Sequence, residues 1–314
     1  MKNEKLSVII VDYNSIIKTL KYIIKLHFII KEDFTIHYVI VENYEKPLNI
    51  SELDILGHDW VIKKKFLHDN NKIYSISNLE TKIDILWNGK NNGFAAGNNI
   101  GTRYTKMCFQ PTFILYSNND ITFCSAFNMK GMSQILREDN SVAAVGPCVV
   151  GINGNRQGPA KKTGYVWGLL LHDFIPDKYK KETEFIKNPK RGYVYWVSGC
   201  FMLVNADKIY RAGLFDKHTF LYCEEMILAE RFLKHHWHFY YDNRVSITHT
   251  GGATISKHAD SIKQLQMKFS SRLYYYRKYI KINFLQQVLA VIVFHSGLIL
   301  HICKNNMCKK LSGE

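Results

Sequence analysis

The chain has 314 residues, of which 46% are hydrophobic and 13% aromatic, and its formal net charge is +15. This composition can fill a hydrophobic core and excludes a disordered chain, and only 6 prolines argue against a long flexible linker. The positive charge would attract nucleic acid or anionic lipid. No nucleic-acid-binding motif is present, so we expect no nucleic-acid partner. The seven cysteines form no C-x-x-C pair and no signal peptide is recognisable, which is typical of a cytoplasmic protein with reduced thiols.

The first half of the chain alternates short apolar runs with helical patterns. This alternation predicts an α/β fold with a mostly parallel central sheet flanked by helices. In such sheets ligands bind beyond the carboxyl ends of the strands, so polar residues that follow strands are the first candidates for a site. Strands are predicted at Leu6–Val11, Ile36–Val41, Ile83–Trp87, Thr112–Tyr116 and Val142–Val145 (ended by Gly146-Pro147), and helices at Ser15–Leu26, Ala95–Lys106 and Ala126–Arg137.

The second half is less regular. Gly151–Gly192 is predicted to be a basic loop region that either covers a substrate or is simply a solvated surface. A buried strand is predicted at Trp196–Val204, a helix at Glu224–His235, and two short strands at His238–Tyr241 and Val245–His249.

The last fifth of the chain is basic and partly apolar. We expect a main domain over residues 1–254 and a C-terminal helical extension over residues 255–314. Phe284–Cys303 is mostly apolar, is interrupted by polar residues and has basic residues on both sides. This pattern favours association with the inner face of the cell membrane. The alternatives are a soluble helical cap, a homodimer contact, or a true membrane span.

Two polar segments are candidates for binding a ligand. Asn118-Asn119-Asp120 follows a predicted strand, where a carboxylate can hold a hard divalent cation against a diphosphate, although an Asx turn has the same pattern. Asn91–Gly101 is rich in asparagine and glycine, which suits either close approach of the backbone to a ligand or tight helix packing.

Two further segments are candidates for catalysis and metal binding. Glu224 and Glu225 begin a predicted helix, where adjacent carboxylates either complement the helix dipole or supply a general base for an acceptor hydroxyl. His249 precedes Thr250-Gly251-Gly252 and is either a structural histidine or a metal ligand.

Taken together and in this order, these segments resemble glycosyltransferase family 2, specifically its bacterial rhamnosyltransferase-like branch. The resemblance covers about Leu6 to Gly252. It depends on eight collinear segments: Val8–Ser15, Val39–Asn43, Asn91–Asn99, Asn118–Asp120, Ser198–Met202, Gly213–Asp216, Phe220–Glu225 and Val245–His249.

The resemblance implies a GT-A fold and an inverting, metal-dependent sugar transfer. The donor would be a UDP- or dTDP-sugar, and the acceptor a hydroxyl of a cell-surface glycan precursor, free or lipid-linked, such as capsule or O-antigen. Asp120 and His249 would bind Mn2+ or Mg2+, Glu225 would be the base, and Glu224 would position the acceptor beside Trp196 and Gly199. The donor would lie against Asp12, Asn14, Glu42, Asn91, Gly93, Phe94, Asn98, Asn118 and Asp120.

Several positions depart from the family pattern. Asn118 stands at the first acid of the D-x-D motif, Glu42 replaces an aspartate, and the base is Glu225 instead of aspartate. Ile227 also replaces a commonly acidic residue. A catalytically inactive protein that binds carbohydrate or nucleotide-sugar is therefore the alternative to an enzyme.

Overall fold

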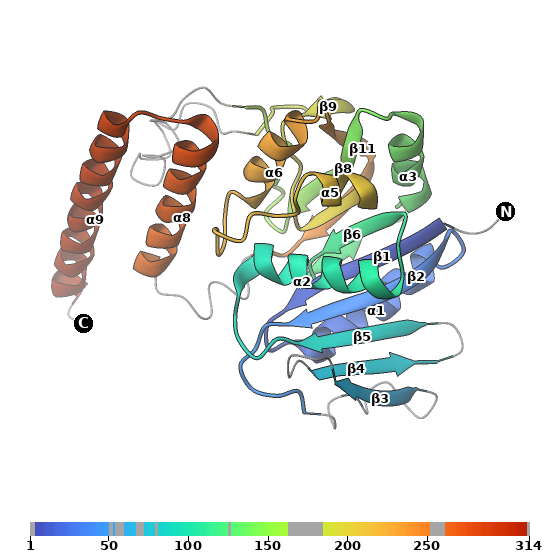
Figure 1. Cartoon of the computed structure of the whole chain (residues 1–314). Helices are drawn as coiled ribbons and strands as arrows, with labels where there is room; N and C mark the ends of the chain where they lie inside the picture. The colour runs from blue at the N-terminus through green and yellow to red at the C-terminus, as the bar shows by residue number, and fades with distance from the viewer. Residues whose placement is uncertain are drawn as a thin grey trace.

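The computed structural model describes residues 4–49, 53, 60–66, 72–78, 81–124, 127–162, 185–251 and 261–312. It has a mixed α/β architecture in which helices cover both faces of one 11-stranded sheet, and two long C-terminal helices lie at one side (Figure 1). The predicted α/β class with a C-terminal helical extension is confirmed.

The sheet is mixed, because parallel strands occupy its centre and antiparallel strands extend it. The pairs β5–β2, β2–β1, β1–β6 and β8–β11 are parallel, as expected for the central sheet, and the other pairs, which the sequence did not reveal, are antiparallel. The strand order is β3-β4-β5-β2-β1-β6-β10-β8-β11-β7, with β9 also paired to β11. The strands are β1 (Glu4–Asp12), β2 (Phe34–Glu42), β3 (Val61–Phe66), β4 (Lys72–Ser77), β5 (Lys82–Trp87), β6 (Phe113–Ser117), β7 (Ile121–Phe123), β8 (Val142–Gly151), β9 (Gly192–Val194), β10 (Phe201–Asn205) and β11 (His238–His249).

Helices cover the sheet according to the alternation of side chains along its strands. In β1, Leu6, Val8 and Ile10 point to the face covered by α1 and α3, whereas Ile9 points to the face covered by α2, α5 and α6. These side chains are fully buried, so β1 is the centre of both hydrophobic layers. The helices are α1 (Ile16–Ile30), α2 (Gly93–Cys108), α3 (Met129–Glu138), α5 (Ala206–Arg211), α6 (Glu224–Leu233), α8 (Ser261–Tyr275) and α9 (Phe284–Ser312), with a π-helical turn, η3 (Tyr276–Ile280), after α8.

Most predicted elements occur, but several boundaries were wrong. β8 continues through Gly146-Pro147 to Gly151, because these residues stay paired with Tyr241 and Asp242 of β11. Glycine is required at position 146, since a Cβ there would lie 2.5 Å from the Val197 side chain. The two short strands predicted after residue 238 are one strand, β11, with an irregular register between Asp242 and Ser246. β10 begins only at Phe201, since the residues before it form a turn.

Two other differences concern helix α3 and the outer strands. Helix α3 begins at Met129, where the Asn128 side chain accepts a hydrogen bond from the Gly131 amide, instead of at Ala126, which lies outside the described residues. Strands β3 and β4 were missed, because Lys63, Lys64 and Lys65 hide the apolar pattern of β3.

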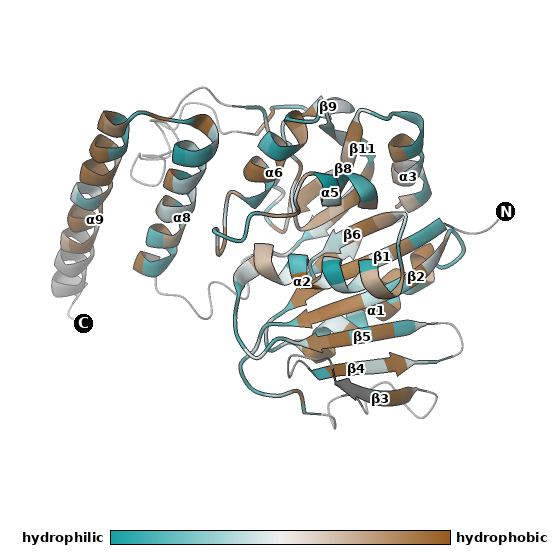
Figure 2. Cartoon of the chain, viewed as in Figure 1, coloured by the Kyte–Doolittle hydropathy of each residue, from teal (hydrophilic) through white to brown (hydrophobic). Residues whose placement is uncertain are grey.

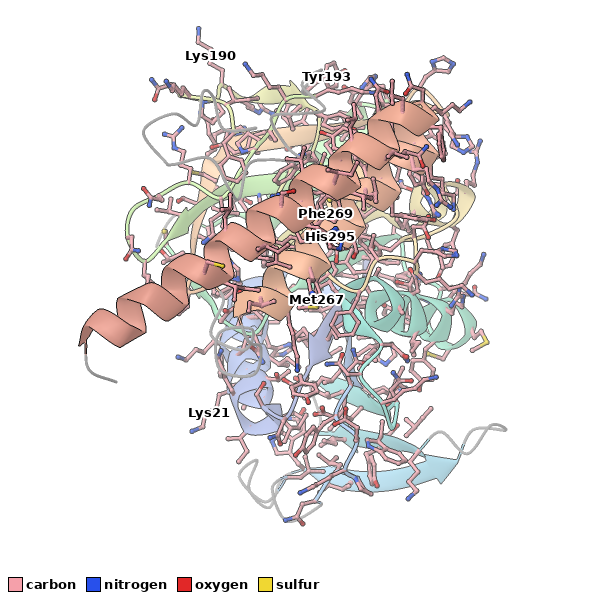
Figure 3. The ribbon with its side chains drawn as sticks, turned by 90° about the vertical axis from the view of Figure 1, so that its left-hand side faces the viewer. Lys21, Lys190, Tyr193, Met267, Phe269 and His295 are labelled. Carbon is pink, nitrogen blue, oxygen red and sulfur yellow. The ribbon has the colours of Figure 1, made fainter. Side chains whose placement is uncertain are left out.

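The C-terminal helices pack against the rest of the chain through hydrophobic side chains. Phe269 of α8 stacks on Phe294 of α9 with ring centroids 3.9 Å apart, and this pair belongs to a hydrophobic cluster that includes Ile227 of α6. Figure 3 shows α9 crossing α8 near Phe269. The predicted domain boundary at residue 254 lies outside the described residues. Within the described part of the chain, helices long and apolar enough to cross a membrane are absent.

A buried carboxylate adds a polar connection to this packing. Asp216 accepts hydrogen bonds from Tyr274 (2.8 Å), Tyr279 (2.6 Å) and Lys278 (3.2 Å), and Nη2 of Arg231 lies 3.1 Å from its Oδ2. These donors come from α6, α8 and η3, so a single side chain joins the C-terminal helices to the sheet domain.

Candidate functional site

The carboxyl ends of β1, β2 and β6 bring three of the predicted segments to one edge of the sheet. In the parallel register, Asp12 of β1 lies beside Glu42 of β2. β6 pairs with β10 so that Ser117 lies opposite Phe201, and the Asn118 amide donates to the Cys200 carbonyl at 2.8 Å. The turn before β10 therefore lies against the segment that carries Asp120.

Asp12 is a buried carboxylate that organises this edge. It is 1% exposed, and it accepts hydrogen bonds from Ser15 N (2.9 Å), Ser15 Oγ (2.6 Å), Thr19 Oγ1 and Asn119 Nδ2 (2.9 Å). All of its donors come from the loop after β1, from α1, and from the segment after β6. Asp12 thus holds the loop and Asn119 in place. A direct contact between Asp12 and a nucleotide-sugar remains a prediction.

Glu42 is also buried, and its environment favours the protonated form. Its Oε1 accepts from the amides of Asn14 (3.2 Å) and Tyr44 (3.0 Å). Burial, and then the charge of the neighbouring Asp12, raise the pKa of Glu42 to about 8. Glu42 is therefore largely protonated at neutral pH, and the amide of Asn14, which has a left-handed φ of 52°, donates to it.

Asp120 and His249 form a close acid–imidazole pair, 129 positions apart in the chain. Asp120 Oδ1 lies 3.1 Å from His249 Nε2, yet it has no aligned hydrogen bond from a described residue. The Gly251 amide donates to Asp120 Oδ2 (3.2 Å), and His249 Nδ1 donates to Gln157 Oε1 (2.5 Å). Burial opposes the charged imidazole, but Asp120 and Cys200 outweigh it and raise the pKa of His249 to about 10.

This pair suits a divalent cation. A carboxylate oxygen and an imidazole nitrogen are ligands of Mn2+ and Mg2+ sites, and two neighbouring ligands of an octahedral ion lie about 3 Å apart. The observed separation is 3.1 Å, and the Asn118 amide nitrogen lies 3.1 Å from the same Nε2. The orphaned Asp120 Oδ1 is the oxygen that such an ion would satisfy. Asp120 and His249, with Asn118 beside them, therefore fit the predicted ion.

Glu225 is joined to the same edge through Gly199. The Gly199 amide donates to Glu225 Oε1 at 2.9 Å, and Gly199 is followed by Cys200, whose carbonyl accepts from Asn118. A Cβ at position 199 would lie 2.6 Å from Glu225 Oε1, so only glycine leaves room for this carboxylate. Burial raises the pKa of Glu225, although the Gly199 amide counteracts it.

Glu224 and Trp196 carry buried polar atoms without partners in the described part of the chain. Glu224 is 5% exposed and its Oε1 has no hydrogen bond, and the indole Nε1 of Trp196 likewise has none. Burial, and then the charge of Glu225, raise the pKa of Glu224 to about 8. An unsatisfied buried donor and acceptor are costly unless a ligand or water pairs with them. They lie in the segments predicted to contact the acceptor.

The loop that carries Glu224 adopts a strained backbone. Tyr222 and Cys223 have φ of 74° and 67°, a region that non-glycine residues rarely adopt. The Phe94 amide, at the start of α2, donates to the Phe220 carbonyl at 3.0 Å. A Cβ at Gly93, whose φ is 76°, would lie 2.1 Å from that carbonyl oxygen. The glycine at position 93 therefore permits the contact that supports the loop.

The remaining residues of the Asn91–Gly101 segment serve packing. Asn91 Oδ1 accepts from the Gly93 amide, and Asn98 Nδ2 donates to the Phe94 carbonyl within the same helix. Gly97 and Gly101 bring α2 against β1 and β2, because added Cβ atoms would lie 2.9 Å from Val11 and 2.7 Å from Ile9. The packing explanation accounts for these side chains, and donor contacts of Asn91, Gly93, Phe94 and Asn98 remain predictions.

Asp120 lines a cavity of about 840 Å³ that runs along α1. Glu225 is not among its lining residues, and residues 163–184 and 252–260 lie outside the described chain. The contacts through Gly199 and Asn118 place Asp120 and Glu225 at the same edge of the sheet. That both face one cleft remains a prediction.

The structure also shows site residues that the sequence did not reveal. Gln157 lies in the basic loop region, and its contact with His249 has no sequence signal. Asn119 was grouped with Asp120, but its side chain turns inward to Asp12, Ser15 and Thr19.

A separate His–Asp–Cys cluster lies away from this edge. His37 Nε2 lies 2.7 Å from Asp84 Oδ2, and Cys108 is close to both. Asp84 also accepts from the hydroxyls of Ser75 and Tyr104. These bonds tie α2 to β2, β4 and β5, so the cluster is a structural network.

Comparison with known proteins adds a distant likeness. No protein-family model matches the sequence, and a search of curated proteins gives no match. Among solved structures, the chain is similar to the crystal structure of GalNAc-T7 with UDP, GalNAc and Mn2+, with a TM-score of 0.49 and 11% sequence identity over 79% of this chain. The match covers 44% of that chain, so this chain spans less than half of that protein.

Proposed function

We propose that the protein is an inverting, metal-dependent glycosyltransferase of the GT-A type that uses a UDP- or dTDP-sugar. The observation that carries this proposal is the contact path from Glu225 through Gly199 and Cys200 to Asn118 and the Asp120–His249 pair. It brings a partly buried carboxylate and a metal-type ligand pair to the carboxyl edge of parallel strands, where α/β sheets bind ligands.

Glu225 acts as the general base for the acceptor hydroxyl. One of its oxygens is oriented by the Gly199 amide at 2.9 Å, which leaves the other oxygen for the acceptor. Burial raises its pKa, which makes it a stronger base than an exposed glutamate. The acceptor oxygen then attacks the anomeric carbon from the face opposite the leaving diphosphate, and the configuration is inverted.

Glu224 positions the acceptor in its neutral form. Its pKa of about 8 keeps it largely protonated at neutral pH, so it can donate a hydrogen bond to an acceptor oxygen. The unpartnered Trp196 indole supplies a second donor. The two adjacent glutamates therefore take different roles, because Glu224 is buried without a partner for its Oε1, whereas Glu225 accepts a hydrogen bond from the Gly199 amide.

The metal ligands are Asp120 and His249. A divalent cation held there supplies positive charge that stabilises the departing nucleoside diphosphate. Asn118, in place of an acid, lowers the negative charge around the ion by one. Asp12 and Glu42 act by holding the loop that carries Asn14, because they accept hydrogen bonds from the amides of Ser15 and Asn14.

Nucleotide release from a panel of UDP- and dTDP-sugars with Mn2+ tests the proposal. Asp120→Asn and Glu225→Gln are expected to abolish transfer, and Glu225→Gln should still bind donor. Glu138→Gln, on exposed α3, is the matched control and should keep full activity. Turnover at the wild-type level in either site variant rejects the assignment. Donor binding without turnover by the wild-type protein would favour the inactive scaffold.

We also propose that α9 rests on the inner face of the cell membrane, where lipid-linked or cell-surface glycan precursors are assembled. Figure 2 shows α9 as apolar around much of its described length, and only a narrow stripe with Ala290, Phe294 and Leu298 packs against α8. Phe284 and Leu300 are 79% and 71% exposed. Residues 261–312 contain basic but no acidic side chains, which suits an anionic lipid surface.

Co-sedimentation with anionic phospholipid vesicles tests this contact. The double variant Leu285→Glu/Ile292→Glu should lose vesicle binding, whereas Met107→Glu, at an exposed apolar position of α2, should not. Equal vesicle binding by both variants rejects the proposal. Dimerisation of the wild-type protein that the double variant abolishes, without vesicle binding, would assign the face to a second copy instead.

A further inference from the structure

The cavity along α1 has a row of lysines that the proposed reaction does not use. Lys18, Lys21 and Lys25 lie at spacings of three and four residues, so they share one face of the helix. Over seven residues the row extends about 10 Å. All three are exposed, and Figure 3 shows Lys21 extending from α1 at the edge of the molecule.

These lysines have no counter-charge in the described part of the chain. None of them forms an ion pair within 4 Å of a described carboxylate. The acid that lines the cavity is Asp120, and its carboxylate already contacts His249 and the Gly251 amide. Like charges on one helix face repel each other, so the row is a surface that an anion would stabilise.

The rest of the wall is suited to oxygen-rich ligands. Asn14, Ser15 and Thr250 line the cavity with amide and hydroxyl groups. Ammonium and hydroxyl donors together match the several acceptor oxygens of a phosphate group. The volume of about 840 Å³ also exceeds what a phosphate alone occupies and leaves room for attached sugar or lipid.

The row starts beside two residues assigned to the donor and extends away from them along α1. Asn14 and Asp120 line the cavity, whereas Asp12, Glu42, Gly93 and Phe94 do not. Lys18 is close enough to Asp120 for its charge to act on that carboxyl, so Lys18 is the lysine that a diphosphate bound at Asp120 would contact first. Lys21 and Lys25 lie one and two turns further along α1. A ligand of Lys21 and Lys25 would therefore be an anionic group other than the donor diphosphate.

We propose that this cavity binds the phosphate ester of an anionic acceptor, in addition to the donor, through Lys21 and Lys25. The inference depends on the proposed glycosyltransferase function, and it adds the chemical class of the acceptor. The phosphate ester comes from a lipid diphosphate carrying the glycan or from phosphodiesters within the glycan chain. Both sources present the same oxygens to the lysines.

Calorimetric titration of the full chain with three probes, in the absence of any donor, tests the proposal. The probes are farnesyl diphosphate, inorganic pyrophosphate and glycerophosphoglycerol. The double variant Lys21→Ala/Lys25→Ala should bind the preferred probe about tenfold more weakly than the wild type. The control Lys106→Ala/Lys130→Ala, which removes the same charge from two other helices, should bind as the wild type does. Binding should also weaken as salt is raised.

The pattern of probes identifies the source. Tighter binding of farnesyl diphosphate than of pyrophosphate assigns a lipid diphosphate, and preference for glycerophosphoglycerol assigns a phosphodiester glycan. Both support the site if the lysine variant weakens the preferred probe. No binding of any probe, or equal binding by the lysine and control variants, overturns it.

A parallel titration with UDP and Mn2+ separates the cavity from the donor site. The lysine variant should bind UDP within twofold of the wild type. A tenfold loss of UDP affinity would show that the lysines belong to the donor site and would overturn the acceptor assignment. Because probe binding needs no turnover, an inactive protein that binds the probes rejects only the proposed function, and an active protein with unaffected lysine variants rejects only this site.

Discussion

Gly93 allows the start of α2 to pack against the loop that leads to Glu224 and Glu225, and replacing this glycine tests that role. Gly93 has φ of 76°, and an added Cβ would lie 2.1 Å from the Phe220 carbonyl oxygen. The neighbouring Phe94 amide donates to the same oxygen at 3.0 Å. Gly93→Ala must therefore shift either the start of α2 or the loop that leads to Glu224 and Glu225.

The expected loss of stability combines two contributions. A left-handed φ costs a non-glycine residue about 1–2 kcal/mol, and loss of one hydrogen bond costs about 1 kcal/mol. With an unfolding entropy of about 2.1 cal/mol/K per residue, a loss of about 2–3 kcal/mol lowers Tm by roughly 3–5 °C in a chain of this length. Gly154→Ala is the matched control, because Gly154 also has φ of 76° but has nothing within 4 Å of the added Cβ.

Calorimetry and nucleotide-release assays measure both consequences. Gly154→Ala should show only the φ cost, a Tm decrease of about 2 °C, with normal activity. Gly93→Ala should be less stable than this control. Because displacement of a catalytic group by about 1 Å costs on the order of 100-fold in rate, its kcat/KM should also fall by that order. Equal Tm and activity in the two variants would refute the reasoning.

Three further predictions concern the acids and the imidazole. Glu42 has a raised pKa of about 8, so the folded state binds its proton more tightly than the unfolded state and stability is lost as pH rises from about 4.5 to 8. Glu42→Gln should remove this loss and raise the free energy of unfolding at pH 9 by roughly 1–3 kcal/mol; equal denaturation curves for both proteins at pH 9 would contradict it. His249 must lose a proton to bind Mn2+, and its pKa is about 10, so the Mn2+ affinity measured by electron paramagnetic resonance should rise about tenfold per unit between pH 6 and 9; a flat profile would exclude His249 as a ligand. Asp216→Asn leaves the charged donors around that buried carboxylate unpaired and should destabilise the chain by about 3 kcal/mol, with faster amide hydrogen exchange in α8; unchanged exchange in α8 would argue against this connection.

The parallel centre of the sheet could be predicted because its strands are buried on both faces. Leu6–Val11 and Ile36–Val41 are largely apolar runs, interrupted by Ser7 and His37, and both are strands in the structure. The antiparallel edge could not be predicted in the same way. β3 carries three consecutive lysines, and β8 continues through a Gly-Pro pair that normally ends a strand.

The candidate site was only partly visible in the sequence. Asp120, Glu225 and His249 were found by resemblance, since contacts between residues more than a hundred positions apart leave no spacing to recognise. The Asn91–Gly101 segment was ambiguous, because glycine serves close packing and ligand approach equally, and the structure uses Gly97 and Gly101 for packing against β1 and β2. The spacing of Lys18, Lys21 and Lys25 is readable from the sequence, but the cavity beside them depends on Thr250 and Asp120 from other elements.

A crystal structure of the chain with UDP and Mn2+ tests the central claim most directly. The claim is that Asp120 and Glu225 face one cleft around a bound nucleotide diphosphate. We predict an anomalous Mn2+ peak within about 2.5 Å of Asp120 and His249, with the UDP diphosphate beside it and the Glu225 carboxylate facing the same space. A metal bound elsewhere, or Glu225 separated from the diphosphate by the sheet, would contradict the account.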